Sequence, residues 1–373
     1  MKKNVLYLAA LSCALCFGFT ACGDDEESTV TPPTTDTPTE EEGVLDVNAT
    51  YTDETLSLTY SGSAMPGKSV KFETTDGETA TLTLEGNFDI TSLLSSVLST
   101  KAALIPDLSM SPGVFPGELT TTISNVTLTK DGEKYTFEGS DSQNGRTAEY
   151  SGEVQNGMLT LNIDNVVMPE DEMQGTWNLN QSQVLSMTWE STTNITIPDM
   201  GEFSTTQLSS MVPLLVNSMI TEALQTISFG NDGNIVANYK EDGAWVDSPL
   251  NIAQYYMKDG QMYVQLNIPM LLQVTQTKAG AISTILDIAE FLPYLSEGVP
   301  VKYTVDGTNA EVYADKDLLL PILSFIANNE TITNAILAEI PADMQTLATA
   351  LMPQIVEVIN TTSEITVGLN LQK

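Results

Sequence analysis

The side chains that usually carry acid–base catalysis are unevenly represented in this sequence. It contains no histidine, whereas Asp and Glu together number 49. Without histidine, Ser-His-Asp and Cys-His catalysis are excluded, and the commonest zinc ligand is missing. A pair of carboxylates is the arrangement that glycosidases use, but nothing in the sequence selects one pair. We therefore predict that the protein is not an enzyme and that it has neither a cofactor nor a bound metal.

Asp315-Lys316-Asp317 is the acidic group that most suggests a cation site. It lacks the regular oxygen spacing and the glycine of an EF-hand loop. An aspartate just before an apolar segment is also typical of a helix cap. We favour the capping interpretation, with a cation site as the alternative.

Three methionines and one tryptophan are the candidate ligand contacts. Met211, Met219 and Met262 belong to apolar stripes, and the flexible thioether suits an irregular apolar pocket. The alternative for each methionine is an ordinary place in the core. Trp245 follows a predicted turn and is the best exposed aromatic candidate for a sugar.

Cys22 has the most specific predicted chemistry. It follows a basic start and an apolar run, Leu6–Phe19, that is too short to span a bilayer comfortably. This order is typical of a cleaved secretion signal, so we predict a signal peptide over residues 1–21 and a lipidated Cys22. Phe19-Thr20-Ala21-Cys22 resembles the lipobox of bacterial lipoproteins, although phenylalanine stands where leucine is usual. An ordinary cleavage site near Ala21, giving a soluble secreted protein, is the alternative.

Residues 22–43 are predicted to form a disordered tether. Asp24–Glu27 are all acidic, and the residues from there to Gly43 are rich in Thr, Pro and Glu. Such a stretch buries almost nothing apolar and stays extended. An acidic run directly after the lipidated cysteine resembles the surface-export signal of Bacteroidota-type lipoproteins. This resemblance implies a lipoprotein of the outer membrane that faces the outside of the cell, and a plain solvated spacer is the alternative.

The charge balance restricts the partners. The formal net charge is −35, from 14 basic and 49 acidic residues. Nucleic acids and anionic membrane surfaces would repel such a chain. We therefore expect no nucleic-acid partner, and we expect contact with the membrane to depend on the N-terminal lipid.

Turn signals and alternating patterns predict a β-rich body. Asp-Gly or Asn-Gly dipeptides favour tight hairpins, and they occur at residues 76–77, 131–132, 144–145, 156–157, 232–233, 242–243, 259–260 and 306–307. Apolar stripes at helical spacing predict intervening helices, around residues 90–98, 208–224, 281–297, 317–328 and 331–359. The predicted fold class is α+β, mostly antiparallel β, with two related sheet or barrel-like units, each with amphipathic helices packed on or in the sheet.

An internal match suggests that the two units arose by duplication. Gly86–Leu93 aligns with Gly201–Leu208, and the two segments share Gly, Phe, Thr and Leu. We expect the glycine to serve a turn and Asp89 or Ser204 to cap the helix that follows. Ser204 with Gln207 has the spacing of a capping box.

The length of the body also favours two units, because it exceeds what one core usually serves. We predict a first β-rich unit over residues 44–174 and a second, more helical one over residues 175–373. The hairpin series Thr120–Ile163, with the lipobox and the acidic run, resembles Bacteroidota lipoproteins that carry lipocalin-like or calycin-like β domains. The helices of the second half resemble instead the lipid-binding fold of bactericidal permeability-increasing proteins.

Both resemblances imply an apolar cavity, and neither transfers a named functional residue. The leading hypothesis is therefore a non-enzymatic lipoprotein, anchored in the outer membrane, that binds an apolar or lipid-like ligand. A surface glycan-binding lipoprotein, or a structural and assembly lipoprotein, is the alternative.

Overall fold

The computed structural model describes residues 45–87, 111–197, 201–275, 294, 296–328 and 342–373. Cys22, the tether, the predicted helix around residues 90–98 and most of that over residues 281–297 lie outside the described residues. The described chain is mostly antiparallel β, as predicted. It divides into two compact units, the first from the described residues of 45–169 and 266–275, and the second from the described residues of 170–265 and 294–373.

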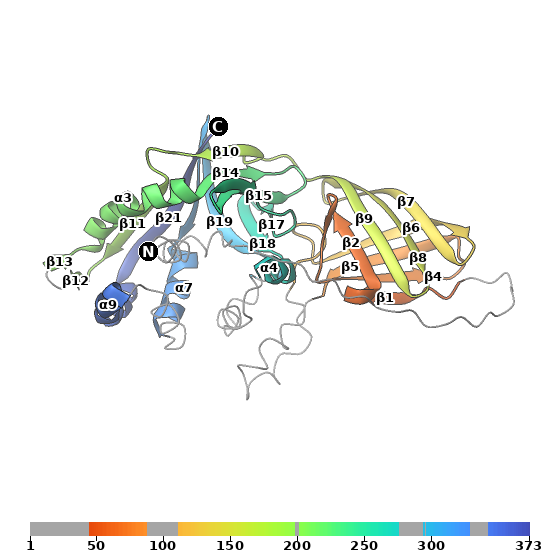
Figure 1. The fold of residues 1–373 in the computed structure, drawn as a ribbon, viewed down its shortest axis with the longest axis horizontal. Coiled ribbons are helices and arrows are strands. Elements are labelled where there is room, and N and C mark those ends of the chain that lie inside the picture. The colour runs from red at the N-terminus through yellow and green to blue at the C-terminus, as the bar shows by residue number, and fades with distance from the viewer. Residues whose placement is uncertain (1–44, 88–110, 198–200, 276–293, 295, 329–341) are drawn as a thin grey trace. The chain divides into compact units, whose positions relative to one another are not determined.

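The first unit is a closed eight-stranded β-barrel. Figure 1 shows its strands in one curved sheet, ordered β1-β4-β5-β6-β7-β8-β9-β2, and the short strand β3 pairs with β2. The elements are β1 (Ala49–Thr52), β2 (Leu56–Tyr60), β3 (Ser63–Ala64), β4 (Lys68–Thr74), β5 (Thr79–Gly86), β6 (Thr120–Asp131), β7 (Lys134–Gln143), β8 (Arg146–Gln155), β9 (Met158–Val167) and the helix α4 (Ile268–Thr275).

One bent segment closes this barrel. β1 pairs antiparallel with β4, and β2, which follows at once, pairs parallel with β9. A short 3-10 turn, η1 (Asp53–Thr55), separates the two halves of the segment, and Asp53 has a φ of 42°. Because this segment pairs with the strands at both ends of the antiparallel series, the barrel presents no long free edge.

The predicted hairpin turns are confirmed. The glycine of each predicted Asp-Gly or Asn-Gly dipeptide has a positive φ. The β7–β8 and β8–β9 connections consist of Asn144-Gly145 and Asn156-Gly157, in which both residues have positive φ. A type I′ turn needs that conformation at both central residues, and Asn and Gly tolerate it best.

Side chains fill the interior of the barrel. Inward residues of the strands, such as Phe72, Leu82 and Leu161, are fully buried. Residues 111–116, which precede β6, are all buried as well and add Val114 to the same core. Over its described residues the first unit is therefore a filled barrel, in which alternate residues along the strands supply the core.

The two glycines of the sequence match have different structural reasons. Gly201 has a φ of 98°, as expected of a turn glycine. Gly86 instead lies within β5, and a Cβ there would lie 2.2 Å from the carbonyl oxygen of Ser111. The expectation of a turn at Gly86 was wrong, because close approach of another backbone is what requires glycine. Residues 88–93 lie outside the described residues, so the rest of the match stays a prediction.

The second unit is built on a ten-stranded sheet that curls into a half-barrel. The strand order is β10-β14-β15-β17-β18-β19-β20-β21-β11, β16 pairs with β15 off this path, and β12 and β13 form a separate hairpin. The strands are β10 (Gly175–Leu179), β11 (Leu185–Ser191), β12 (Ile195–Ile197), β13 (Gly201–Phe203), β14 (Leu224–Phe229), β15 (Asn234–Glu241), β16 (Ala244–Asp247), β17 (Ala253–Lys258), β18 (Gln261–Leu266), β19 (Val299–Asp306), β20 (Asn309–Asp315) and β21 (Thr362–Gln372).

Among the described residues, this unit contains the helices α3 (Thr205–Ala223), α7 (Lys316–Asn328) and α9 (Ala342–Asn360). α7 confirms the helix predicted over residues 317–328. α9 confirms the later part of the helix predicted over residues 331–359, whose beginning lies outside the described residues. In the described part of the chain, no helix is long and apolar enough to cross a membrane.

The capping box predicted at the start of α3 is present. The Ser204 hydroxyl accepts a hydrogen bond from the Gln207 backbone N–H at 3.2 Å, and Gln207 Oε1 accepts one from the Ser204 N–H at 2.9 Å. Two N–H groups that the first helical turn leaves unpaired are thereby satisfied. Pro213 lies inside the helix.

The packed face of α3 differs from the predicted stripe. Its buried residues are Thr205, Ser209 and Ile220, whereas Leu215, which we expected on the packed face, is 68% exposed. A hydrogen bond to the sheet is one physical reason why this face of α3 packs inward: Thr205 Oγ1 accepts a hydrogen bond from the Ser191 N–H at 3.0 Å. A polar residue of the helix thus pairs a backbone group of β11, and the leucine faces outward.

Candidate functional site

A cleft on the second unit brings together side chains from three neighbouring strands and from the helix that follows them. Its volume is about 370 Å³. The strands β18, β19 and β20 supply most of the lining, and Tyr294 and the start of α7 supply the rest. The described lining residues are Gln261, Tyr263, Tyr294, Pro300, Lys302, Tyr313, Asp315, Asp317 and Leu318. The lining is therefore mainly aromatic and polar.

The strand register explains why these residues share one face of the sheet. Tyr263 lies opposite Pro300, and Lys302 lies opposite Tyr313. Residues two apart on a strand point to the same side, so these four side chains and Gln261 project together. Neighbouring strands are about 4.8 Å apart, which separates the tyrosines of β18 and β20 by roughly 10 Å across the sheet.

A second tyrosine holds Tyr263 in place. Tyr256, on β17, stacks on it with ring centroids 5.1 Å apart and an interplanar angle of 14°. The Tyr256 hydroxyl donates a hydrogen bond to the Glu297 carbonyl oxygen at 2.7 Å. Burial, together with the nearby Tyr263 and Glu297, raises the pKa of Tyr256 to about 12, so this phenol stays neutral and keeps its hydrogen bond. The stack covers one face of Tyr263, which is also a lining residue of the cleft.

Lys302 and Asp315 form an ion pair in the cleft. Lys302 Nζ donates a hydrogen bond to Asp315 Oδ2. The other oxygen of Asp315, Oδ1, accepts a hydrogen bond from the Asp317 backbone N–H at 3.1 Å, at the start of α7. Burial acts to raise the pKa of Asp315, but Lys302 and the N–H groups of Asp317 and Leu318 outweigh it and lower the pKa. Both oxygens are therefore engaged, which confirms the capping interpretation of this segment.

The methionines that we predicted as ligand contacts lie outside this cleft. Met262 is fully buried, and it alternates with Tyr263 along β18, so it points to the opposite face of the strand. It belongs to the core, which was the alternative interpretation. Met211 and Met219 are half-buried on α3, and neither is among the described residues that line the cleft.

The predicted aromatic contact also lies elsewhere. Trp245 is on β16 and is 40% exposed, and Lys240 Nζ lies 5.6 Å from its ring centre. It is not among the described lining residues of the cleft. The predicted lipidation site, Cys22, lies outside the described residues.

Sequence reasoning missed the tyrosines because an ordinary strand pattern hides them. Met262 and Val264 are buried on β18, and Tyr263 stands between them like any residue of an exposed face. An aromatic residue on the polar face of β18, and another on that of β20, was the available signal. The pairing that places Tyr263 and Tyr313 on one face joins segments far apart in the sequence, so the signal could not be assembled without the register.

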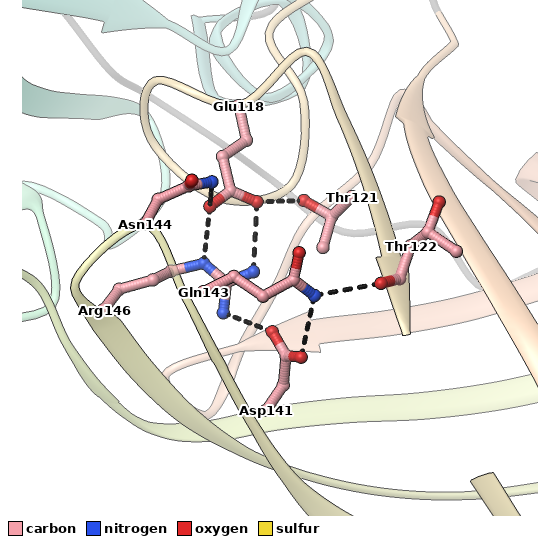
Figure 2. Close-up of polar contacts among 7 residues, drawn as sticks. All are labelled: Glu118, Thr121, Thr122, Asp141, Gln143, Asn144 and Arg146. Atoms are coloured by element: carbon pink, nitrogen blue, oxygen red, sulfur yellow. Dashed lines mark hydrogen bonds and ion pairs between the residues drawn. The ribbon is translucent and has the colours of Figure 1, made fainter. Parts of the chain in front are cut away.

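The first unit contains a buried ionic cluster around Arg146, which is 1% exposed. Its guanidinium is bidentate to Glu118, with Nε–Oε1 and Nη2–Oε2 distances of 2.9 and 3.0 Å. Nη1 donates to Asp141 Oδ2 at 2.7 Å, and Cζ lies 3.5 Å from the centre of the Phe115 ring. Figure 2 shows the other polar side chains that bind the two carboxylates, Thr121, Gln143 and Asn144. These hydrogen bonds, all made within the protein, indicate a structural cluster.

A second buried basic residue, Lys68, binds the chain a few residues before Glu118. Lys68 is 1% exposed, and its Nζ donates to the carbonyl oxygens of Pro112 and Gly113 at 2.6 and 3.1 Å. Burial lowers the pKa of Lys68 to about 7. Lys68 and Arg146 thus hold residues 112–118, which precede β6, to the barrel.

Neither a metal site in the described residues nor a matching family indicates the function of this chain. Among the described residues, no group of three or more acidic or cysteine side chains could hold a metal ion. The resemblances to lipocalin-like lipoproteins and to bactericidal permeability-increasing proteins stay predictions. No family model, no curated protein and no solved structure matches this chain, so the chemistry of the cleft is the guide to function.

Proposed function

We propose that this chain is a lipid-anchored, non-enzymatic protein of the outer-membrane surface that binds a glycan in the tyrosine cleft of its second unit. One observation carries the proposal: a stacked tyrosine, Tyr263, lines the same cleft as the Lys302–Asp315 hydrogen-bonded pair. The glycan was the alternative ligand from the sequence, and the cleft favours it over the apolar ligand.

The chemistry of the cleft suits a sugar better than a purely apolar molecule. A pyranose has a face of C–H groups and a rim of hydroxyls. The negative face of an aromatic ring attracts such C–H groups, and charged or amide side chains pair well with hydroxyls. A volume of about 370 Å³ lies near the lower end of the usual range of small-ligand sites, roughly 300–1,000 Å³. The cleft therefore suits a short stretch of a glycan.

The state of Asp315 supports binding without hydrolysis. A glycosidase needs one carboxylic acid that stays protonated and a second carboxylate in a matched position. The pKa of Asp315 is lowered, and both its oxygens already accept hydrogen bonds. It is a poor proton donor, so we propose that it binds hydroxyls through its ion pair and does not act as a general acid.

Two features of the sequence remain part of the proposal. The lipobox at Phe19–Cys22 and the acidic run Asp24–Glu27 support a lipid anchor and export to the cell surface. The match of Gly86–Leu93 with Gly201–Leu208 supports a common origin of the two units. Incorporation of labelled palmitate in the native host, lost in Cys22→Ser, would test the anchor.

Binding of oligosaccharides to the mature chain, with Cys22→Ser to keep it soluble, tests the proposed ligand. A glycan array identifies a binder, and calorimetry gives its affinity. Tyr263→Ala should weaken binding about tenfold, since an aromatic contact of about 1.4 kcal/mol is lost. Tyr263→Phe, which keeps the stack, should retain most of the affinity. Unchanged retention of every glycan by Tyr263→Ala, with Trp245→Ala as the matched aromatic control, would count against the cleft.

A second candidate ligand is apolar or lipid-like, and the exposed face of α3 favours it. Leu214 and Leu215 are 80% and 68% exposed. Residues 203–221 carry no charged side chain in a chain of net charge −35. An exposed apolar pair on an uncharged helix is a typical contact for an apolar molecule. Native mass spectrometry of the mature chain incubated with a lipid extract should show an adduct that the double variant Leu214→Ser/Leu215→Ser loses, and a uniformly unliganded mass would exclude this candidate.

A further inference from the structure

The charges that line the cleft are unequal. Among the described lining residues, Lys302 is the single basic side chain, whereas Asp315 and Asp317 are both acidic. Lys302 is hydrogen-bonded to Asp315, and that bond raises the pKa of the lysine. The positive charge of the cleft is thus already matched by a carboxylate, and a second carboxylate remains.

The same aspartate also occupies the other electropositive feature of the cleft. The N-terminus of a helix attracts anions through its free N–H groups and its dipole. Asp315 Oδ1 already accepts the hydrogen bond of the Asp317 N–H at the start of α7. One side chain therefore neutralises both the lysine and the helix end.

We infer that the cleft selects uncharged glycans over anionic ones, and that Asp315 sets this selectivity by neutralising Lys302. The inference rests on the proposed function and names its ligand class. An anionic sugar would have to displace Asp315 from Lys302 while facing Asp317, in a chain whose net charge is −35. Buried or partly buried like charges repel strongly, whereas a neutral hydroxyl can share the hydrogen bonds of the pair. The pair then acts as a donor and an acceptor for neighbouring hydroxyls.

Asp315→Asn tests the charge of this side chain apart from its role as a helix cap. Asparagine caps a helix about as well as aspartate, so the start of α7 should be preserved. The amide removes the negative charge beside Lys302 and leaves the lysine unneutralised. This variant should therefore gain affinity for anionic glycans without losing the fold.

The test uses matched pairs of oligosaccharides that differ only in the charge of the sugar ring. Suitable pairs are β-1,4-linked mannohexaose with β-1,4-linked hexamannuronate and α-1,4-linked galactohexaose with α-1,4-linked hexagalacturonate, measured by calorimetry on the mature Cys22→Ser chain at two salt concentrations. The unsubstituted cleft should prefer the neutral member by about tenfold or more, and this preference should fall as added salt screens the repulsion of the anionic member. Asp315→Asn should reduce or reverse this preference, and binding of the anionic member by this variant should weaken as the salt concentration rises.

Two controls keep the outcomes distinct. Lys302→Gln in the Asp315→Asn background should abolish the gain in affinity for the anionic member, because the positive charge of the lysine is no longer present. Equal or tighter binding of the uronates by the unsubstituted cleft would overturn the inference while leaving glycan binding intact. Failure of every neutral and anionic glycan to bind would overturn the proposed function, and the selectivity with it.

Discussion

Arg146 in the first unit and Lys302 in the second are both ion-paired, but their surroundings differ. Arg146 is 1% exposed and is enclosed by Glu118, Asp141 and Phe115. Lys302 is 44% exposed and lies in a cleft beside tyrosines. The first pair fixes a buried chain segment, whereas the second lies at the surface of the cleft that we propose as the binding site.

The two sheets explain this difference. A closed barrel turns one face of every strand inward, where side chains must fill the space and polar groups must be paired. The half-barrel of the second unit buries Met262 and Val301 on one face and leaves Tyr263 and Lys302 on the other. Closure thus leaves a filled interior in the first unit, and the open sheet of the second leaves one face for the cleft that we propose as the binding site.

The largest expected effect comes from removing the buried cation of the first unit. Arg146→Ala leaves Glu118 and Asp141 buried without their partner, which should lower the free energy of unfolding of that unit by about 3–5 kcal/mol. All three tryptophans lie beyond residue 170, so tryptophan fluorescence follows only the second unit. Urea unfolding should therefore show an earlier transition by circular dichroism and an unchanged one by tryptophan fluorescence.

Lys71→Ala is the matched control for that experiment. The Lys71–Glu73 pair lies in the same unit, but its side chains are 53% and 52% exposed. Its loss should cost under about 1 kcal/mol. An equal shift of the tryptophan transition in Arg146→Ala would contradict the separation of the two units.

Lys68 should make the stability of the first unit depend on pH. Its pKa is about 7 in the folded state and about 10.4 when unfolded. Between these values the unfolded chain binds one more proton, so this residue makes stability rise with pH by about 1.4 kcal/mol per pH unit. Below pH 7 the cost of the buried charge is fully present and the contribution is flat. We expect the difference in unfolding free energy between the unsubstituted chain and Lys68→Met to rise with this slope between pH 7 and 10. A difference that stays constant with pH would exclude this role of Lys68.

The helix cap of α3 should have a moderate effect confined to the second unit. Ser204→Ala removes the acceptor for the Gln207 N–H and should lower the free energy of unfolding by about 1 kcal/mol. The tryptophan transition should report the loss. Ser210→Ala, inside the same helix, is the control, because alanine favours a helix interior. A similar loss in both variants would mean that the cap is not the cause.

The smallest effect is expected at the exposed leucine of α3. Leu214→Ser changes a side chain that is 80% exposed, so the free energy of unfolding should change by no more than about 0.5 kcal/mol. Ile220→Ala on the buried face of the same helix should cost about 2–5 kcal/mol. A large loss in Leu214→Ser would show that this side chain is packed in solution.

Local chemistry made much of the fold predictable. The hairpin turns followed from Asn-Gly and Asp-Gly dipeptides, the cap at Ser204 from its spacing to Gln207, and the helix α7 from its apolar stripe. Each depends on residues close together in the chain. The buried face of α3 was not predictable in the same way, because Thr205 bonds to β11 and Leu215 turns outward.

The sequence by itself determined the β-rich class, the positions of the turns, the absence of histidine and a net charge of −35. Only the tertiary structure decided which faces meet. The pairing of β18 with β19, and of β19 with β20, brings Tyr263 and Tyr313 to one cleft and sends Met262 into the core. A shift of one residue in this register would exchange the two faces. Register depends on contacts between distant segments, and a local pattern does not specify it.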